Sequence, residues 1–460
     1  MTGMTTAERR ATSALASLFA LRMLGLFMII PVFALYGQQL QGATPALIGL
    51  AIGAYALVQA VFQIPLGLLA DRMDRKRLIF QGLILFAVGG GVAALSTSIW
   101  GVIAGRAIQG AGAISAVVMA LLADLTREEN RTKAMASIGL SIGLSFAVAF
   151  IIGPLVAGHF GLSGLFWATS VLAVIGMGLL ATVPHPAVAI PQNPQNWREQ
   201  CGKILHHAEL MRLNAGIFVL HLVMTACFVL VPHLLRDNAG IPPAHHGWVY
   251  LPVVLGGFVL AVPAIIVAER KRKIKQVFAS GILLLAAGLA VMGAGYATIY
   301  GLIAGLVLFF MAFNLQEALL PSLLSKIAPA GSKATAMGIY SSAQFLGAGA
   351  GGVLGGQLWK NIHEGHIAYG GAFAVLSLLT LVWFLLALGM KQPRFLHSLT
   401  LSIELASPED GRAVASRLLT VPGVEEAVVI AAHGLAYLKV DKERLDAARL
   451  HDLVPGAVAV

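Results

Sequence analysis

The sequence is poor in charge and in cysteine. Only 11% of its 460 residues are Asp, Glu, Lys or Arg, and its two cysteines are Cys201 and Cys227. Soluble domains carry about a quarter charged residues, so this composition excludes an ordinary soluble enzyme. Two cysteines cannot build a disulfide scaffold, and a hydrophobic share of 58% excludes a disordered chain. The chain is instead rich in apolar residues, and its 51 glycines show no collagen period. This composition indicates a polytopic membrane protein with closely packed helices.

Apolar runs close to the roughly 20 residues of a membrane-spanning helix recur along the chain. They lie at about 12–36, 45–70, 78–97, 100–123, 135–158, 164–184, 213–235, 247–268, 277–296, 299–324, 334–358 and 368–390. We therefore predict an all-α membrane protein of twelve transmembrane helices, whose even number leaves both termini on one side. Most of the 31 Lys and Arg fall in the N-terminus, the even-numbered loops and the stretch after the last span. Basic loops stay in the cytoplasm, so we expect cytoplasmic termini, and the net charge of +10 reflects topology and lipid headgroups, not nucleic acid.

The hydrophobic pattern breaks over residues 185–212, where prolines and a polar run indicate a cytoplasmic linker. The linker separates residues 1–184 from residues 213–392, and each part holds six predicted spans. Short segments repeat between the parts in one register, for example Lys133-Ala134-Met135-Ala136 and Lys333-Ala334-Thr335-Ala336. Two related six-helix bundles around a site at the middle of the bilayer are typical of secondary transporters.

Residues 397–460 have the composition of a small cytosolic domain. Alternating apolar residues over 399–405 predict a strand, and the following patterns predict further elements. These are a helix at 408–419, strands at 427–431 and 435–440, a helix at 442–453 and an edge strand at 457–460. This order is typical of an α+β ferredoxin-like fold. Metal-handling domains of this shape carry Cys-x-x-Cys in the first loop, which has no cysteine here, so a regulatory or packing role with an unknown ligand or partner is expected.

Charged and strongly polar side chains inside the predicted spans are the candidates for a transport site. Each charged one costs roughly 2.5–3.5 kcal/mol on insertion scales, so it is normally kept for function or paired. The candidates for proton coupling and for the lining of a substrate cavity are Arg22, Gln59, Gln63, Arg106, His221, Asn314 and Glu317.

Glu317 is the only acid that we place inside a span. Apart from a lipid-facing or interfacial position without a function, it allows two interpretations. It can neutralise an arginine in a buried pair that fixes helix packing. Alternatively, it can load and release a proton, since desolvation favours the neutral form of a carboxyl group. Histidine has an unperturbed pKa suited to switching, but for His221 a hydrogen-bonded structural role is the favoured interpretation.

Four segments resemble motifs of the major facilitator superfamily. The run from Gly67 to Arg77 is similar to its motif A, and Arg106 to Ala113 resembles motif B. Gly153 to Gly158 resembles the antiporter motif C, which includes Pro154. Leu24-Gly25 followed by Pro31-Val32 resembles a span-one motif of the drug:proton antiporters. The four occur in the right order on the right predicted spans, and a soluble tail of this type resembles that of bacterial inner-membrane transporters.

The resemblance implies roles for individual residues. Motif A implies a conformational latch formed by Gly67, Asp71, Arg72, Arg75 and Asp124. In it Asp71 would face the start of the helix near Ser332, and Arg75 would pair with an acid such as Asp124. The motif B arginine, Arg106, is implicated in proton coupling.

Motif C implies roles for three further residues. Gly153 and Pro154 would bend span five and let it approach a helix of the other half, with Gly158 closing the motif. The chain departs from the family pattern at Asp74, where motif A has glycine. It also has Arg22 on span one, where many members have an acid. That exchange moves the expected proton site to Glu317.

Two other classes of function remain as alternatives. Gly139-Leu140-Ser141-Ile142-Gly143 matches a nucleophile-elbow pattern, and Ser163 lies in a rhomboid-like motif, so an intramembrane enzyme has to be considered. The elbow requires a strand, turn and helix, whereas Ser141 lies within a predicted span, so we expect no enzyme. A transporter-like sensor that signals through the C-terminal domain is the second alternative.

The sequence therefore predicts a proton-driven efflux transporter in a bacterial inner membrane. It would export a small organic molecule by alternating access, most simply as an antiporter. We expect protons, that substrate and bilayer lipids as its partners, no nucleic acid, and neither a metal nor a cofactor beyond the proton motive force.

Overall fold

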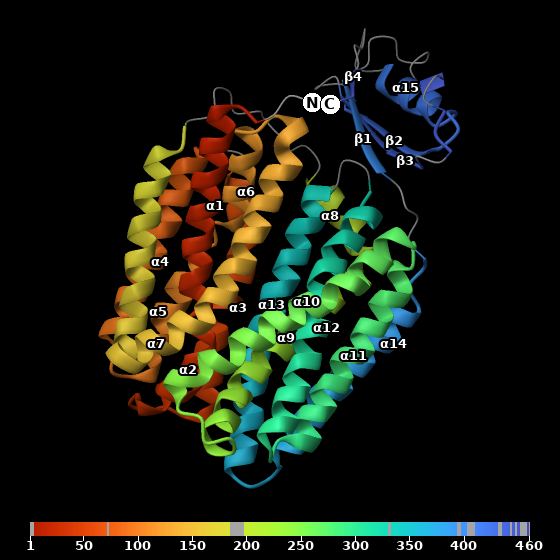
Figure 1. Ribbon diagram of the computed structural model, residues 1–460. Coiled ribbons are helices and arrows are strands. Elements are labelled where there is room, and N and C mark those ends of the chain that lie inside the picture. Colours follow the sequence, from red (N-terminus) through yellow and green to blue (C-terminus); the bar gives the residue numbers. More distant parts are fainter. Residues whose placement is uncertain are drawn as a thin grey trace. The chain divides into compact units, whose positions relative to one another are not determined.

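A computed structural model gives the fold of the chain (Figure 1). It describes residues 4–70, 73–184, 197–329, 333–392, 397–402, 410–430, 435–441, 444–446, 449–450 and 458–459. Contacts divide the chain into two compact units. The first unit comprises Met1–Pro194, Asn214–Ala318 and Gly338–Gly389, and the second comprises Gln195–Leu213, Leu319–Met337 and Met390–Val460.

The helices fall into two groups, here called the first half and the second half. The first half has α1 (Thr6–Phe27), α2 (Ile30–Tyr36), the 3-10 turn η1 (Gly37–Gln39), α3 (Pro45–Leu69), α4 (Arg75–Leu95), α5 (Ile99–Ala111), α6 (Ser115–Asp124) and α7 (Glu128–Thr182). A short helix, α8 (Trp197–Leu205), follows. The second half has α9 (Ala208–Asp237), η3 (Pro243–His245), α10 (His246–Arg270), α11 (Ile274–Gly295), α12 (Ile299–Ile327), α13 (Lys333–His363) and α14 (Tyr369–Leu388).

Local sequence signals set where several helices begin. Thr5 caps α1 in a capping box with Glu8, because each side chain bonds to the other residue's backbone N–H. Asp74 accepts a hydrogen bond from the Arg77 N–H and caps α4. The acid that departs from the motif A glycine therefore begins a helix.

Two predicted spans are broken helices, which corrects the sequence prediction of one continuous helix each. The run 12–36 is divided between α1 and α2, because the chain restarts at Ile30 with a proline in the first turn. The run 100–123 is divided between α5 and α6, because Gly112 leaves the helical region with ψ of 42°.

Ten segments of the described residues are long and apolar enough to cross a membrane. One of them, Lys133–Thr182, contains both predicted spans five and six. It changes direction at Gly161, whose φ of 65° and ψ of −168° are open to glycine and strained for other residues. The long, glycine-rich α13 is not among the ten. A count of twelve spans stays a prediction.

The two halves touch backbone to backbone where α3 lies beside α13 (Figure 1). A Cβ atom built on Gly49 would lie 2.3 Å from the Gly352 carbonyl oxygen, and one on Gly53 would lie 2.5 Å from that of Gly349. This contact lies toward the ends of α3 and α13 that are on the same side as Tyr36, which we call the Tyr36 end. Only glycine permits this approach, so these residues hold the halves together at the Tyr36 end.

The C-terminal residues form a four-stranded sheet. Its elements are β1 (His397–Ser402), α15 (Asp410–Leu418), β2 (Val424–Ile430), β3 (Leu435–Val440) and β4 (Val458–Ala459). The strand order is β2-β3-β1-β4, and β3 pairs antiparallel with both β1 and β2. This small sheet agrees with the predicted α+β pattern, although β1 ends at Ser402 and residues 403–409 lie outside the described part. Most of the helix predicted over 442–453 also lies outside it.

Candidate functional site

Glu317, on α12, lies in a polar cluster with side chains from two other helices of the second half. Its Oε1 accepts a hydrogen bond of 3.3 Å from Gln344 Nε2 on α13. The same nitrogen lies 2.8 Å from Nε2 of His221 on α9, and that His221 atom lies 3.9 Å from Glu317 Oε2. The Glu317 side chain is 41% exposed, whereas that of His221 is 10% exposed. The cluster therefore places a partly accessible carboxylate beside an imidazole and a shared amide donor.

This environment bears on the two interpretations of Glu317. Among the ion pairs of the described residues, Glu317 faces His221 and no arginine. A carboxylate with a neutral amide donor and a histidine beside it can bind and release a proton without breaking an arginine pair.

Asn314 and Gln316 flank Glu317 in sequence but contact other helices. The Asn314 side-chain amide donates to the Val254 carbonyl of α10 at 3.4 Å. Gln316 is fully buried and donates to the Phe278 carbonyl of α11 at 2.7 Å. The structure therefore separates them from the Glu317 cluster, and their contacts hold α12 to its neighbours.

Arg22, on α1, is buried among uncharged acceptors of the first half. Its Nη1 donates to Ser115 Oγ at 2.8 Å. Its Nη2 donates to the Tyr55 hydroxyl at 2.9 Å, the Gly112 carbonyl at 3.1 Å and Gln59 Oε1 at 3.3 Å. These contacts join α1 to α3 and to the break between α5 and α6.

Arg106, on α5, lies close to the same tyrosine. Its guanidinium carbon is 4.9 Å from the centre of the Tyr55 ring, within the range of a cation–π contact. Its Nη1 donates to Gln109 Oε1 at 3.0 Å, and Gln109 in turn donates to Thr169 Oγ1 at 3.0 Å. Tyr55 therefore connects the two candidate arginines. Gln63 is buried on α3 and shares no described hydrogen bond with either of them.

Arg75, in the motif A segment, forms an ion pair with Asp124 at the end of α6, and both residues belong to the first unit. Arg75 Nη1 lies 2.5 Å from Asp124 Oδ2 and 2.8 Å from the Ala120 carbonyl oxygen. Both charged side chains are at most 9% exposed, so the pair ties the start of α4 to the end of α6. Gly67 has room for a Cβ atom, with Ala116 Cβ 3.9 Å away. Asp71, Arg72 and Ser332 lie outside the described residues.

The motif C residues lie on α7 and have different neighbours. A Cβ atom on Gly153 would lie 2.5 Å from the Met28 carbonyl oxygen, which belongs to the first half. Gly153 itself therefore packs on the break between α1 and α2, while span five approaches the other half nearby, where a Cβ atom on Gly247 of α10 would lie 2.7 Å from the Phe150 carbonyl oxygen. Gly158 faces Ala244 of the second half at 3.3 Å, and Pro154 lies inside the helix between them.

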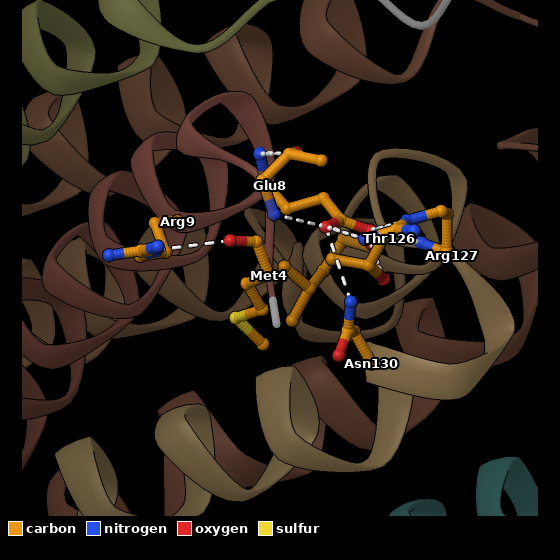
Figure 2. A network of polar contacts seen from close by, with 8 residues as sticks. Met4, Glu8, Arg9, Thr126, Arg127 and Asn130 are labelled. Carbon is orange, nitrogen blue, oxygen red and sulfur yellow. Dashed lines mark hydrogen bonds and ion pairs between the residues drawn. The ribbon is translucent and has the colours of Figure 1, made fainter. Parts of the chain in front are cut away.

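Sequence reasoning missed Glu8, which forms an ion pair with Arg127 inside a network of polar contacts (Figure 2). Its Oε1 accepts from the backbone N–H and Nε of Arg127 at 2.9 and 3.0 Å. Its Oε2 accepts from Arg127 Nη2, from Asn130 Nδ2 at 3.2 Å and from the Thr5 N–H at 2.7 Å. The network ties the start of α1 to the start of α7. The capping-box spacing of Thr5 and Glu8 was the available signal, but Arg127 is distant in sequence.

A contact between the halves was also missed. Gln38, in η1 of the first half, has its Nε2 2.8 Å from Nε2 of His233 on α9. The His233 ring stacks on Trp359 of α13, with 4.0 Å between ring centres. These residues add polar and aromatic contacts at the Tyr36 end.

The two serines of the enzyme-like patterns donate hydrogen bonds to backbone carbonyls. Ser141 Oγ donates to the Ile138 carbonyl and Ser163 Oγ donates to the Ala94 carbonyl, both at 2.7 Å. Neither hydroxyl has a histidine among its described hydrogen-bond partners.

The fold and these sites agree with the comparisons to known proteins. The family profile of the Major Facilitator Superfamily matches residues 15–352 and 213–419, so the chain belongs to this family of multi-pass membrane transporters. The chain is 48% identical to the inner membrane transport protein YajR of Escherichia coli K12, over 96% of each chain. It is 25% identical to the multidrug resistance protein MdtH of Aeromonas salmonicida, over 73% of this chain and 84% of that one. The structure of the nucleoside transporter NupG has the same fold, with a TM-score of 0.68, 15% identity, and coverage of 82% and 99% of the two chains.

Proposed function

We propose that the protein is a proton-coupled exporter of a small organic molecule, with Glu317 as the proton-binding group. The observation that carries this proposal is the contact of Glu317 with Gln344 and His221 in the second half. A partly exposed carboxylate can take up a proton, and protonation removes the charge that Gln344 and His221 face.

The helix α13 connects the Glu317 cluster with the contact between the halves. Gln344 lies on α13 little more than one turn before Gly349, which packs against Gly53 of α3. A change in the Gln344 hydrogen bonds therefore acts on the same helix that holds the halves together. Because the two sites share one rigid element, proton binding biases the equilibrium between conformations, as alternating access requires.

Other features support the direction of transport and the location of the protein in the cell. Motif C and the relationship to MdtH, a multidrug resistance protein by name, support export by antiport. The distribution of Lys and Arg supports cytoplasmic termini, and the relationship to YajR supports an inner-membrane location. The Tyr36 end then faces the periplasm, and this structure has the halves in contact there.

Proton flux in proteoliposomes tests the proposal. The full chain is reconstituted into liposomes that enclose a pH-sensitive dye. Amphipathic drugs, sugars and small metabolites are then added one at a time. At least one compound should move protons in the presence of the protein and not in empty liposomes. A complete lack of compound-dependent proton movement, in protein that is folded and inserted, would contradict proton coupling.

The C-terminal domain supports a second candidate, a transporter-like sensor. Within the second unit, buried Lys439 on β3 donates to the Lys326 carbonyl of α12, the helix that also carries Glu317. Deletion of residues 397–460 distinguishes the two. A transporter keeps its flux, whereas a sensor keeps ligand binding and loses its downstream output.

A further inference from the structure

Two buried guanidinium groups of the first half have no carboxylate partner in the described residues. Arg22 and Arg106 are 2% and 1% exposed, and both contact Tyr55. Every hydrogen-bond partner that the structure gives them is uncharged. These partners are the side chains of Ser115, Tyr55, Gln59 and Gln109 and the Gly112 carbonyl. Buried charges are normally compensated by an opposite charge, so this cluster is exceptional.

The same cluster also has hydrogen-bond donors without acceptors. Arg22 Nε, Arg106 Nε and Gln59 Nε2 are buried and have no partner among the described residues. Buried donors of this kind are nearly always paired in folded proteins. Two uncompensated positive charges and three donor nitrogens without a described acceptor thus gather on α1, α3 and α5, which is the chemistry that an anion requires.

We propose that Arg22 and Arg106 bind the anionic group of the transported molecule, and that the substrates are small organic anions with a carboxylate or sulfonate. This inference rests on the proposed transport function and adds a substrate class to it. A carboxylate or sulfonate accepts two parallel hydrogen bonds from a guanidinium and balances its charge. Uncharged acceptors hold a guanidinium less strongly, so an anion replaces Ser115, Tyr55 or Gln59 as the partner of Arg22.

Three compounds of one shape and different charge test the proposal directly. Benzoate, benzamide and benzamidinium carry charges of −1, 0 and +1 on nearly identical planar bodies. Their binding to the purified full chain is measured by titration calorimetry at constant ionic strength. Benzoate should bind at least about tenfold more tightly than the other two, since hydrogen bonds to charged groups are the strong ones. Equal affinities, or a preference for benzamidinium, would overturn the proposal.

Variants of the chain locate the binding. Arg22→Gln and Arg106→Gln should each weaken benzoate binding about tenfold. Arg22→Lys keeps the charge and should keep the preference for benzoate. Arg270→Gln, at an exposed position, is the matched control. Benzoate binding that is unchanged in both arginine-to-glutamine variants would overturn the assignment.

The binding experiment tests the anion site independently of the transport proposal, because binding needs no proton gradient. Intact proton-coupled flux with no preference for benzoate refutes the anion site alone. A variant without a cooperative melting transition is not folded and cannot be used. If Arg22→Gln is such a variant, benzoate binding by Arg106→Gln and Arg22→Lys tests the assignment.

Discussion

His221 and Glu317 face each other from α9 and α12, with 3.9 Å between His221 Nε2 and Glu317 Oε2, and Gln344 contacts both. The His221 side chain comes from α9, far from the consecutive helices α12 and α13 that carry Glu317 and Gln344. Their meeting places a titratable carboxylate next to α13, the helix that makes the glycine contact with the first half. In the proposed function, this relationship connects proton binding at Glu317 with the contact between the halves.

Replacement of Gln344 by leucine should reduce coupled flux about tenfold. The substitution removes the amide that donates to Glu317 and contacts His221, and hydrogen bonds to charged groups contribute roughly 1.5–3 kcal/mol. Proton flux in proteoliposomes measures the effect, with Gln39→Leu at an exposed position as control. Equal flux in both variants would show that Gln344 has no part in coupling.

Replacement of Gly53 by valine should move the halves apart at the Tyr36 end. A Cβ atom there would lie 2.5 Å from the Gly349 carbonyl oxygen, so the close contact cannot form. The distance between spin labels at positions 39 and 298 is measured by pulsed electron paramagnetic resonance. The labelled chain also carries Cys201→Ser and Cys227→Ala, so that only the introduced cysteines react. Gly256→Val is the control, because nothing lies within 4 Å of its Cβ position. An unchanged distance in Gly53→Val would rule out this contact as the determinant of the conformation.

Replacement of Glu8 by glutamine should destabilise the first half by roughly 1–3 kcal/mol. The amide has one acceptor oxygen and no charge, so it cannot accept all the hydrogen bonds that the two carboxylate oxygens take from Arg127, Asn130 and Thr5 (Figure 2). Thermal unfolding in detergent should therefore begin at a lower temperature. Glu364→Gln, whose side chain is 43% exposed, serves as control, and equal melting of the two variants would contradict a stabilising role for the network.

Cys201 provides a test of orientation. Burial raises the pKa of the Cys201 thiol, so its thiolate fraction at pH 7 is smaller than that of a free cysteine. Reaction with a maleimide should be slow at pH 7 and rise about tenfold per pH unit below that pKa. A membrane-impermeant maleimide should label it in inside-out vesicles and not in spheroplasts, with Cys201→Ser as the blank, since Cys227 is buried. Labelling from the outside would reverse the proposed topology.

The sequence predicted the transporter fold and the strand β1 because both depend on local pattern. Runs of apolar residues are long enough to identify helices, and the alternation that includes Leu399 and Leu401 identifies an antiparallel strand of the small sheet. Breaks within helices were missed, because the restart at Ile30 and the conformation of Gly112 depend on packing against α7, α3 and α4.

The sites were harder to predict, since they depend on residues that meet across the fold. Glu317 and Arg106 stand out as charges in apolar segments, but nothing near them in sequence points to Gln344 or Tyr55. Gly153 packs on Met28, and the approach of span five to the other half lies at Phe150 and Gly247, because a glycine pattern shows that a backbone approaches closely and not which backbone.

The most direct test of proton coupling separates exchange from accumulation. In proteoliposomes, wild-type protein should accumulate a transported compound against its gradient when a pH gradient is imposed, and should also exchange it at equal pH. Glu317→Gln should keep exchange and lose accumulation, with Glu364→Gln behaving as wild type. If Glu317→Gln still accumulates the compound in response to the pH gradient, Glu317 is not the proton-binding group and the proposed mechanism is wrong.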